Sequence, residues 1–271
     1  MNKNYTYKKF IKHPFYTEGP VVDPAGNWFF TDLAGGSIIR ISSDGNQTIW
    51  AKATCPNGQA LLSNGQHIIC DSTSGLLKKF DSNGIFMENI IEQSCAGEII
   101  KTPNDVIRDH MGNIYFTDST RENGKVGYIS TSGQEKIIAR GLDYPNGLAL
   151  SIDGEYLFVA ESYKNRILAY HLNNEGIPLT GFSIVANLPR HPSNKCEKNL
   201  PDGIKVDQKG MIWVAHYGMG KVHQLSPDGE LLRSIDIPFD LVSNLFIKSK
   251  TLIVTGGYSE PGPGAIIEIE L

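Results

Sequence analysis

The residues that decide the fold are Thr102-Pro-Asn-Asp-Val-Ile-Arg-Asp-His-Met-Gly-Asn-Ile-Tyr-Phe-Thr-Asp118. They contain a polar residue after proline, a short apolar strand, a hairpin tip with glycine, and a second apolar strand with a polar end. The pattern returns along the chain in altered form, at intervals of 39, 47, 42, 56 and 42 residues. Intervals of about 40 to 50 residues are typical of β-propeller blades. The recurring polar residues, the first ring, are Glu18, Asn57, Asn104, Asn146, Asp202 and Asn244.

Each repeat has room for four strands, because short apolar runs alternate with turn sequences such as Pro24-Ala-Gly-Asn27. Runs rich in Val, Ile, Phe and Tyr are expected where neighbouring blades cover both faces of a sheet. We therefore predict an all-β fold, a six-bladed β-propeller with four-stranded blades, formed as a single domain by residues 1–271. The last repeat lacks one strand. The strand-like residues 5–10 are predicted to close that blade and cover its open edge.

Composition excludes some classes of partner and some cellular locations. The net charge is −4 and the basic residues are scattered, so nucleic acid is not expected as a partner. The N-terminal residues lack an apolar core of signal-peptide length, and no stretch approaches the roughly 20 apolar residues of a membrane helix. The four cysteines show no CxxC spacing and are expected to be reduced. We expect a cytoplasmic protein without a membrane partner, as a monomer or small homo-oligomer.

A second polar position follows each first-ring residue by 14, 14, 14, 15, 14 and 12 residues. If the first strand of each blade runs inward and the second returns, both positions lie on one face. The sequence thus predicts two polar rings around one opening. For the three aspartates of the second ring, capping of a turn is the commoner explanation. The second ring consists of Asp32, Asp71, Asp118, Glu161, His216 and Gly256.

The first ring has the chemistry of a cation site. A single Pro-Asn-Gly is an ordinary turn, but Glu18 has no turn preference and Asp202 stands where other repeats have asparagine. Two carboxylates with carboxamides offer hard oxygen donors and a formal charge of −2. Such donors fit Ca²⁺ best, then Mg²⁺ or Mn²⁺, and Zn²⁺ less well. A six-bladed channel is too wide for every residue to reach one ion, so the ion is expected off the axis.

Four phrases carry a resemblance to a known family. They are Thr17-Glu-Gly-Pro20, Thr102-Pro-Asn-Asp105 with Tyr115-Phe-Thr-Asp118, Tyr144-Pro-Asn-Gly147 and Leu200-Pro-Asp-Gly203. In this chain order they resemble the SMP-30/gluconolactonase/luciferin-regenerating family, from about Phe15 to the C-terminus, and they look most similar to a bacterial branch that includes drug-responsive lactonases. The resemblance implies a six-bladed propeller with a divalent metal in a central funnel, and lactone hydrolysis.

The resemblance also implies roles for single residues. It places metal ligands at Glu18, Asn146 and Asp202, and makes Asn104 a ligand of the metal or of the substrate. Some sugar-lactone members have an arginine shortly before that asparagine, where this chain has Lys101. Asn57 and Asn244 match no ligand of the family and are interpreted as turn or wall residues.

For a lactone, the metal would polarise the carbonyl and lower the pKa of a bound water. Asp202 is the predicted catalytic residue, either as the base for that water or as a ligand only, and both readings stay open. His216 is predicted to orient Asp202 or carry a proton to the leaving alkoxide, or else to be a wall residue. Ser119, Thr120 and Tyr217 are predicted to face the substrate, together with Asn104 and His216.

The predicted function is therefore that of a divalent-metal-dependent hydrolase that opens a small-molecule lactone. The alternatives are an organophosphate hydrolase with a similar cage, and a non-enzymatic ligand-binding propeller with a structural metal. Fold alone cannot choose between them. The chain has no Gly-x-Ser-x-Gly motif, so the sequence does not support a serine hydrolase.

Overall fold

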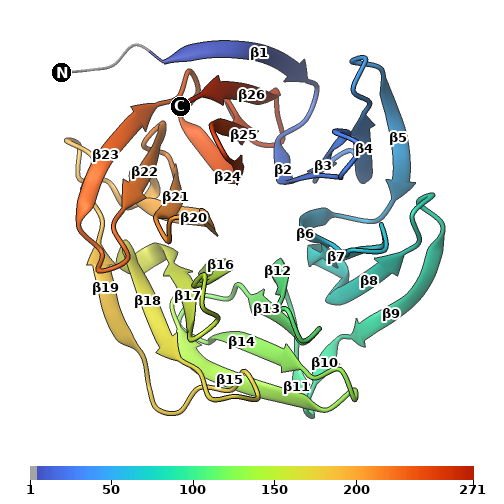
Figure 1. Cartoon of the computed structure of the whole chain (residues 1–271), viewed down its shortest axis with the longest axis vertical. Coiled ribbons are helices and arrows are strands. Elements are labelled where there is room, and N and C mark those ends of the chain that lie inside the picture. The colour runs from blue at the N-terminus through green and yellow to red at the C-terminus, as the bar shows by residue number, and fades with distance from the viewer. Residues whose placement is uncertain (1–4) are drawn as a thin grey trace.

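A computed structural model describes residues 5–271, and over these residues six four-stranded sheets surround a central axis (Figure 1). This confirms the predicted all-β six-bladed propeller. The blades are numbered in chain order, with strands given from the axis outward. Blade 1 consists of β2 (Thr17–Val22), β3 (Trp28–Asp32), β4 (Ser37–Ile41) and β5 (Gln47–Lys52). Blade 2 consists of β6 (Pro56–Leu61), β7 (His67–Asp71), β8 (Leu76–Phe80) and β9 (Phe86–Glu92). Blade 3 consists of β12 (Pro103–Arg108), β13 (Ile114–Asp118), β14 (Gly124–Ile129) and β15 (Glu135–Leu142).

Blades 4 and 5 continue the ring, and short elements decorate its connections. A two-stranded sheet and three single-turn 3-10 helices lie between the main strands. None of the helices in residues 5–271 has the length and apolarity of a membrane span. Blade 4 consists of β16 (Pro145–Leu150), β17 (Tyr156–Glu161), β18 (Arg166–His171) and β19 (Ser183–Asn187), and blade 5 of β20 (Leu200–Val206), β21 (Ile212–Tyr217), β22 (Lys221–Leu225) and β23 (Leu231–Asp236). The two-stranded sheet pairs β10 (Ser94–Cys95) with β11 (Glu98–Ile99), and the 3-10 helices are η1 (Ser72–Ser74), η2 (Ser162–Lys164) and η3 (Cys196–Lys198).

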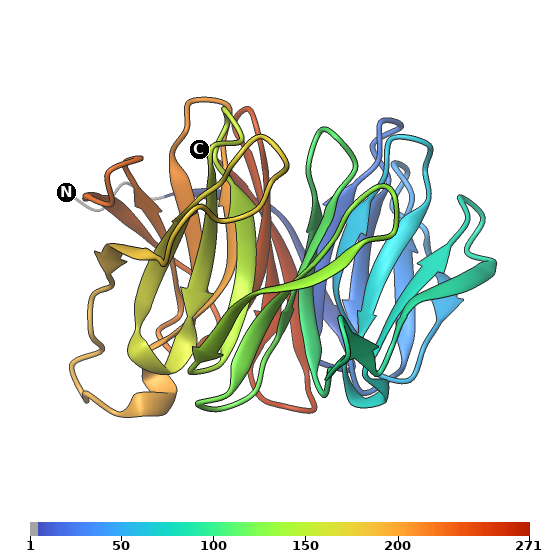
Figure 2. The same cartoon turned by 90° about the horizontal axis from the view of Figure 1, so that it is seen from below.

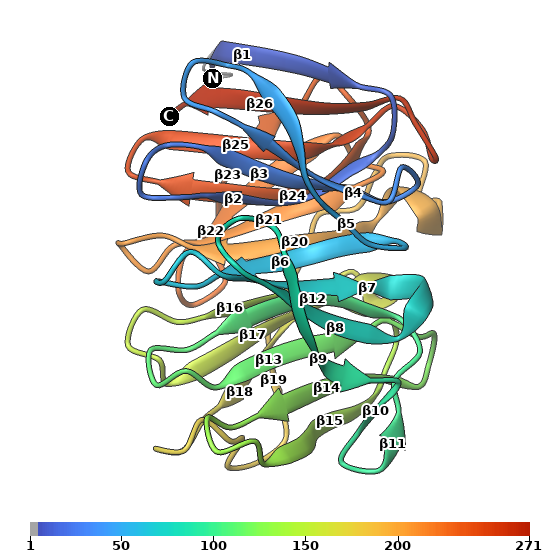
Figure 3. The same cartoon turned by 90° about the vertical axis from the view of Figure 1, so that its right-hand side faces the viewer.

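Blade 6 combines both ends of the chain. Its strands run from the axis as β24 (Leu241–Lys248), β25 (Thr251–Gly257), β26 (Gly264–Glu270) and β1 (Thr6–His13). β1 pairs antiparallel with β26, and the two strands lie side by side in Figure 3. The strand begins and ends later than the residues 5–10 expected from the sequence. This pairing covers the backbone edge of β26, which would otherwise be open.

In blades 1, 3 and 5, the hairpin between the first two strands is capped by an aspartate, which is Asp23, Asp109 or Asp207. Between β12 and β13, Asp109 Oδ1 accepts hydrogen bonds from the N–H groups of Gly112 at 2.7 Å and Asn113 at 2.8 Å. Gly112 has a φ of +102°, a conformation that side chains disfavour. The Asp-x-x-Gly-Asn sequence therefore reverses the chain by local chemistry alone, which explains why the repeats are visible in the sequence.

Apolar side chains on both faces of each blade hold neighbouring blades together. Between blades 5 and 6, Trp213, Val222, Leu252 and Ile267 are no more than 1% exposed. Each such side chain contributes about 1.5–3 kcal/mol relative to full exposure. Because this apolar packing fixes the inner strands, the polar groups that they carry toward the axis are also fixed.

All four cysteines are free thiols.

Glycines let the inner strands of adjacent blades approach closely. A Cβ on Gly147 would lie 2.3 Å from the backbone oxygen of Asp202, and one on Gly203 would lie 2.2 Å from Asn244 Oδ1. No methyl group fits at such distances, so glycine follows Asn146 and Asp202 because of the close packing of the strands. The close approach brings first-ring side chains of neighbouring blades together.

The strand register corrects one first-ring assignment. In blade 5, Pro201 pairs with His216 and Ile204 pairs with Val214. In blade 6, Val242 pairs with Gly256 and Leu245 pairs with Val254, which puts Ser243, not Asn244, in the position of Asp202. Asn244 takes the place of the following glycine. The sequence misleads here because no proline marks the position before the ring residue.

Candidate functional site

A cavity of about 190 Å³ lies at the end of the inner strands where the first ring gathers. The segment with η3 and the loop between β25 and β26 project from one end of the propeller, the lower end in Figure 2. The first ring contributes five polar residues to the cavity lining, which are Glu18, Asn57, Asn104, Asn146 and Asp202.

The structure therefore brings all four predicted metal ligands, Glu18, Asn104, Asn146 and Asp202, to one cavity. Each is at most 7% exposed. The inner strands are bulged at these positions: the pairing register shifts between Pro145 and Leu148 in blade 4, as it does in the other blades. A bulge re-aims side chains and interrupts the ladder, which explains how consecutive residues present polar groups to the axis.

The two carboxylates of the ring are buried, and the negative charges around them outnumber the positive ones. Burial raises the pKa of Glu18 to about 7, although the Gly19 N–H and the Asn244 amide oppose the shift. Burial, followed by the charges of Glu18 and Asp105, raises the pKa of Asp202 well above its usual range. Both effects indicate a place where a bound cation would be favourable.

Asn146 adds an unsatisfied oxygen to this place. Its Nδ2 group donates to Ser162 Oγ at 3.4 Å, while its buried Oδ1 has no hydrogen-bond partner among residues 5–271. A buried carboxamide oxygen usually has a partner. No group of three or more His, Cys, Asp or Glu side chains forms a metal cluster in the part of the chain described. The cage here instead mixes carboxylates with carboxamides, a donor set that suits a hard divalent cation.

The second ring does not face the cavity. Asp71 accepts the N–H groups of Thr54 and Cys55, at 3.1 and 2.7 Å. Asp118 accepts the N–H groups of Lys101 and Thr102 in the same way. These carboxylates cap the connections between blades, as the commoner explanation for them predicts. The strand pairing places both rings at the same end of the sheets, as predicted, but the cavity lining includes none of Asp32, Asp71, Asp118 and Glu161.

Of the residues predicted to contact substrate besides Asn104, only Tyr217 lines the cavity. Ser119 is buried and donates to the backbone oxygen of Pro145, and Thr120 lies outside the lining. His216 is fully buried, with Nδ1 2.9 Å from His223 Nε2. Burial and the neighbouring His223 lower the pKa of His216 to about 3, so its ring is neutral near pH 7. Ser119, Thr120 and His216 are thus not among the residues that line the cavity, although the buried Nε2 of His216 has no hydrogen-bond partner among the described residues.

Four tyrosines that the sequence did not single out as a group form the aromatic wall of the cavity. Tyr16 and Tyr217 pack edge to face with ring centroids 6.2 Å apart, and Tyr144 packs on Tyr163 at 5.6 Å. Tyr217 donates its hydroxyl hydrogen bond to Glu260 Oε1 at 2.8 Å. The wall residues Tyr16, Tyr144, Tyr163 and Tyr217 come from blades 1, 4 and 5, with Tyr144 and Tyr163 both in blade 4, so the proximity of the three blades' tyrosines has no local signal in the sequence.

Tyr16 has an unused donor beside the carboxylates. It is 4% exposed, and its hydroxyl has no hydrogen-bond partner among the described residues. Burial, then the charges of Asp202 and Glu18, raise its pKa well above the usual range. The phenol therefore stays protonated and can donate to a ligand oxygen in the cavity.

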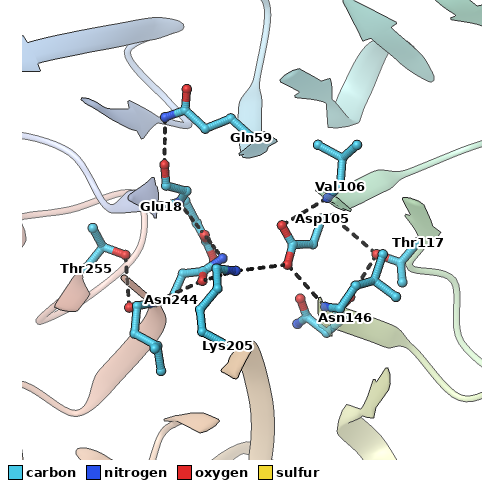
Figure 4. A network of polar contacts seen from close by, with 12 residues as sticks. Glu18, Gln59, Asp105, Val106, Thr117, Asn146, Lys205, Asn244 and Thr255 are labelled. Carbon is cyan, nitrogen blue, oxygen red and sulfur yellow. Dashed lines mark hydrogen bonds and ion pairs between the residues drawn. The ribbon is translucent and has the colours of Figure 1, made fainter. Parts of the chain in front are cut away.

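Beneath the cavity, Asp105 and Lys205 form a further polar group that the sequence analysis missed. Asp105 Oδ1 accepts the Val106 N–H at 3.0 Å, and its Oδ2 accepts the Leu148 N–H at 3.2 Å. Lys205 Nζ lies 3.9 Å from Asp105 Oδ2. Figure 4 shows this pair beside Glu18. The available signal was positional: Asp105 follows the ring residue of blade 3, where blades 2, 4 and 5 have glycine.

Comparisons with known proteins agree with this architecture. The SMP-30/Gluconolactonase/LRE-like region, as a protein family, matches residues 16–257. A gluconolactonase of Zymomonas mobilis is 26% identical over 278 residues, covering 90% of this chain and 77% of its own length. The lactonase drp35 of Staphylococcus haemolyticus is 27% identical over 234 residues, covering 82% of this chain and 69% of its own.

A solved gluconolactonase of Xanthomonas campestris has the same fold, with a TM-score of 0.79 at 24% identity over 95% of this chain and 87% of that one. The family match covers most of the chain, including every first-ring residue and the aromatic wall up to Tyr217. The segments around Glu18, Asn104, Asn146 and Asp202 thus all lie within the residues that match the family. The chain belongs to the SMP-30/gluconolactonase/LRE-like family.

Proposed function

We propose that this protein hydrolyses a small lactone in the first-ring cavity, with the help of one divalent cation. The observation that carries the proposal is the buried pair Glu18 and Asp202 beside the unpaired oxygen of Asn146, all facing a cavity of small-molecule size. The names of the relatives, gluconolactonase and lactonase, support the choice of a cyclic ester. A propeller by itself supports many functions, so the site bears the argument.

The residues present fit a cation. Glu18, Asn146 and Asp202 would hold it, with Asn104 as a further ligand or as a contact to the substrate. Ca²⁺ is the ion we propose, because oxygen donors in an irregular cage suit it. When bound, the ion would polarise the ester carbonyl and make a bound water more acidic.

The chain supplies the remaining chemistry. Asp202 either accepts a proton from the attacking water or serves as a ligand only. The Tyr16 hydroxyl donates a hydrogen bond to an oxygen of the lactone, which stabilises negative charge that develops there. The tyrosine wall excludes water and packs against the ring of the substrate. After ring opening, the product carries a carboxylate, and the charge of Glu260 in the cavity lining favours its release, because the cation balances the buried carboxylates.

A panel of lactones tests the proposal. Sugar-derived and aromatic lactones are offered to chelated protein, and again after Ca²⁺, Mg²⁺, Mn²⁺ or Zn²⁺ is restored, with ring opening followed by acid release. We expect hydrolysis that disappears with chelator and returns with one ion, Ca²⁺ before the others. Folded protein that binds an ion yet opens no lactone would redirect the function to a phosphotriester hydrolase or a ligand-binding propeller.

The Tyr16→Phe variant tests the unused donor. We expect kcat for the best lactone to fall by about tenfold to a hundredfold, as for loss of one hydrogen bond to developing charge. Calcium affinity should change little, because the phenol is not among the proposed ligands. Tyr128→Phe is a suitable control, since the Tyr128 hydroxyl donates to Glu175 O, away from the cavity lining. Equal kcat in Tyr16→Phe and wild type would remove Tyr16 from the mechanism.

A further inference from the structure

Lys205 is a charged residue at a position of the inner strand that is apolar in the other blades. By strand pairing it stands opposite Trp213, directly after the bulge of β20. The residues paired at the same place in blades 1, 2, 3, 4 and 6 are Val21, Ala60, Ile107, Ala149 and Phe246. Side-chain entropy and desolvation both disfavour a lysine in such a layer, so a specific interaction must compensate.

The contacts of Lys205 provide that interaction. Its side chain is 26% exposed, and its Nζ lies 3.9 Å from Asp105 Oδ2 in blade 3 and 3.5 Å from Asn244 Oδ1 in blade 6. In Figure 4 the ammonium group lies between these two residues. Asn244 in turn donates from Nδ2 to Glu18 Oε2 at 3.1 Å. The lysine thus links three blades directly beneath the proposed cation ligands.

The charges around the axis can now be summed. Glu18, Asp105 and Asp202 are at most 7% exposed and bring three negative charges, while Lys205 brings one positive charge. The formal total is minus two, which one divalent cation balances. The Lys205 charge also lowers the pKa of Glu18, in opposition to burial and to Asp105. Without the lysine, the group would carry an excess of one negative charge in a poorly solvated place.

We propose that Lys205 is a built-in counter-charge for the buried carboxylates Glu18, Asp105 and Asp202, which sets the net charge of the site so that a single divalent cation neutralises it. The inference rests on the proposed function only for the presence of a divalent cation at the site. Its consequence is that Lys205 weakens cation binding: the ammonium repels the ion and keeps its affinity moderate.

The effect is one of charge, because Asn244 does not depend on the lysine for its orientation. Asn244 Oδ1 also accepts the Leu245 N–H at 2.8 Å, a shorter hydrogen bond than the 3.5 Å contact with Lys205 Nζ. Removal of the ammonium therefore leaves the Asn244 amide aimed at Glu18. A purely structural lysine would do the opposite, since its loss would disorder Glu18 and weaken cation binding.

The test is Ca²⁺ binding by isothermal titration calorimetry on chelated wild type, Lys205→Met and Lys205→Arg, at one pH and ionic strength. We expect Lys205→Met to bind Ca²⁺ about tenfold more tightly, because a nearby positive charge has been removed. Lys205→Arg keeps the charge and should stay within about threefold of wild type. Asp105→Asn should weaken binding, and the double variant Lys205→Met/Asp105→Asn should return close to wild type because its net charge is again minus two.

The sign of the change decides the outcome. Weaker or equal binding by folded Lys205→Met would overturn the inference even if wild type hydrolyses lactones and requires Ca²⁺. Absence of Ca²⁺ binding in wild type would also overturn it, and would remove the ion from the proposed function. Lactone turnover is measured separately. If the variants bind Ca²⁺ as expected but wild type opens no lactone, the result supports the counter-charge role of Lys205 and contradicts the proposed reaction.

Discussion

The Asp202→Asn variant is expected to fold and to lose lactone turnover by about a hundredfold to ten-thousandfold, the range observed for loss of a catalytic base. Asp202 is 7% exposed, and burial with the charge of Glu18 raises its pKa. Replacing this carboxylate by a neutral amide of the same shape relieves repulsion in the metal-free protein. The melting temperature of chelated protein should therefore stay level or rise while kcat/KM falls.

Calcium titration separates the two readings of Asp202. If the carboxylate is a ligand only, Asp202→Asn binds Ca²⁺ more weakly and saturating Ca²⁺ restores much of the rate. If it accepts the proton of the attacking water, the rate stays low at saturating Ca²⁺. Full turnover in a variant with Ca²⁺ bound would show that Asp202 is dispensable.

Asp71→Asn is the matched control, since Asp71 is also a buried aspartate near the end of an inner hairpin. Burial alone would raise the pKa of Asp71, but the Lys78 ammonium and the N–H groups of Thr54 and Cys55 outweigh it and hold the pKa below its usual range. Asp71 therefore stabilises the fold above its unfolded pKa near 3.9, and this contribution is lost as the pH falls through the folded value. The control should lower the melting temperature at pH 7 and leave turnover per folded molecule intact.

The Gly147→Ala variant is expected to lose about 3 kcal/mol of stability, which corresponds to a fall of about 6–12 °C in melting temperature. A Cβ at Gly147 would lie 2.3 Å from Asp202 O and 2.6 Å from the Ile204 nitrogen. Both are backbone atoms of β20, so neither can rotate away. The inner strands of blades 4 and 5 must separate, which also pulls Asn146 from Asp202 and should weaken Ca²⁺ binding.

Gly181→Ala is the control for this substitution. A Cβ at Gly181 meets no atom within 4 Å, and Gly181 is not among the glycines with positive φ. We expect its melting temperature to stay within about 2 °C of wild type, as for surface substitutions in general. If Gly147→Ala were as stable as Gly181→Ala, close approach of the inner strands would not be what requires glycine there.

The sequence predicted the fold because its signals are local and repeated. Each blade is one unit whose hairpin turns depend on nearby residues, such as the Asp109 cap on Gly112 and Asn113. Six copies make the period visible. The meeting of Glu18, Asn104, Asn146 and Asp202 at one cavity could also be predicted, because these positions recur in the repeats and Glu18 and Asp202 depart from the turn residues expected there. Their role as metal ligands stays a prediction.

The sequence failed where the direction or register of a side chain mattered. Asp118 caps the connection before β12, while Asn104, which starts the same hairpin, faces the cavity. Spacing cannot distinguish these two directions, because both residues lie at the same end of the sheet. Asn244 was placed one residue off its register, since no proline marks the position before the ring residue in blade 6, where Val242 stands.

The sequence by itself determined the six-fold repeat and the oxygen donors of the first ring, since both follow from residue type and spacing along one chain. Only the tertiary structure decided which charges meet at the axis. Asp105 and Lys205 are 100 residues apart and belong to blades 3 and 5, yet they lie 3.9 Å apart. Their charges cancel, so the net charge of minus two counted from Glu18 and Asp202 still holds. The physical reason is that Coulomb energy depends on distance and burial in space, which no one-dimensional pattern records.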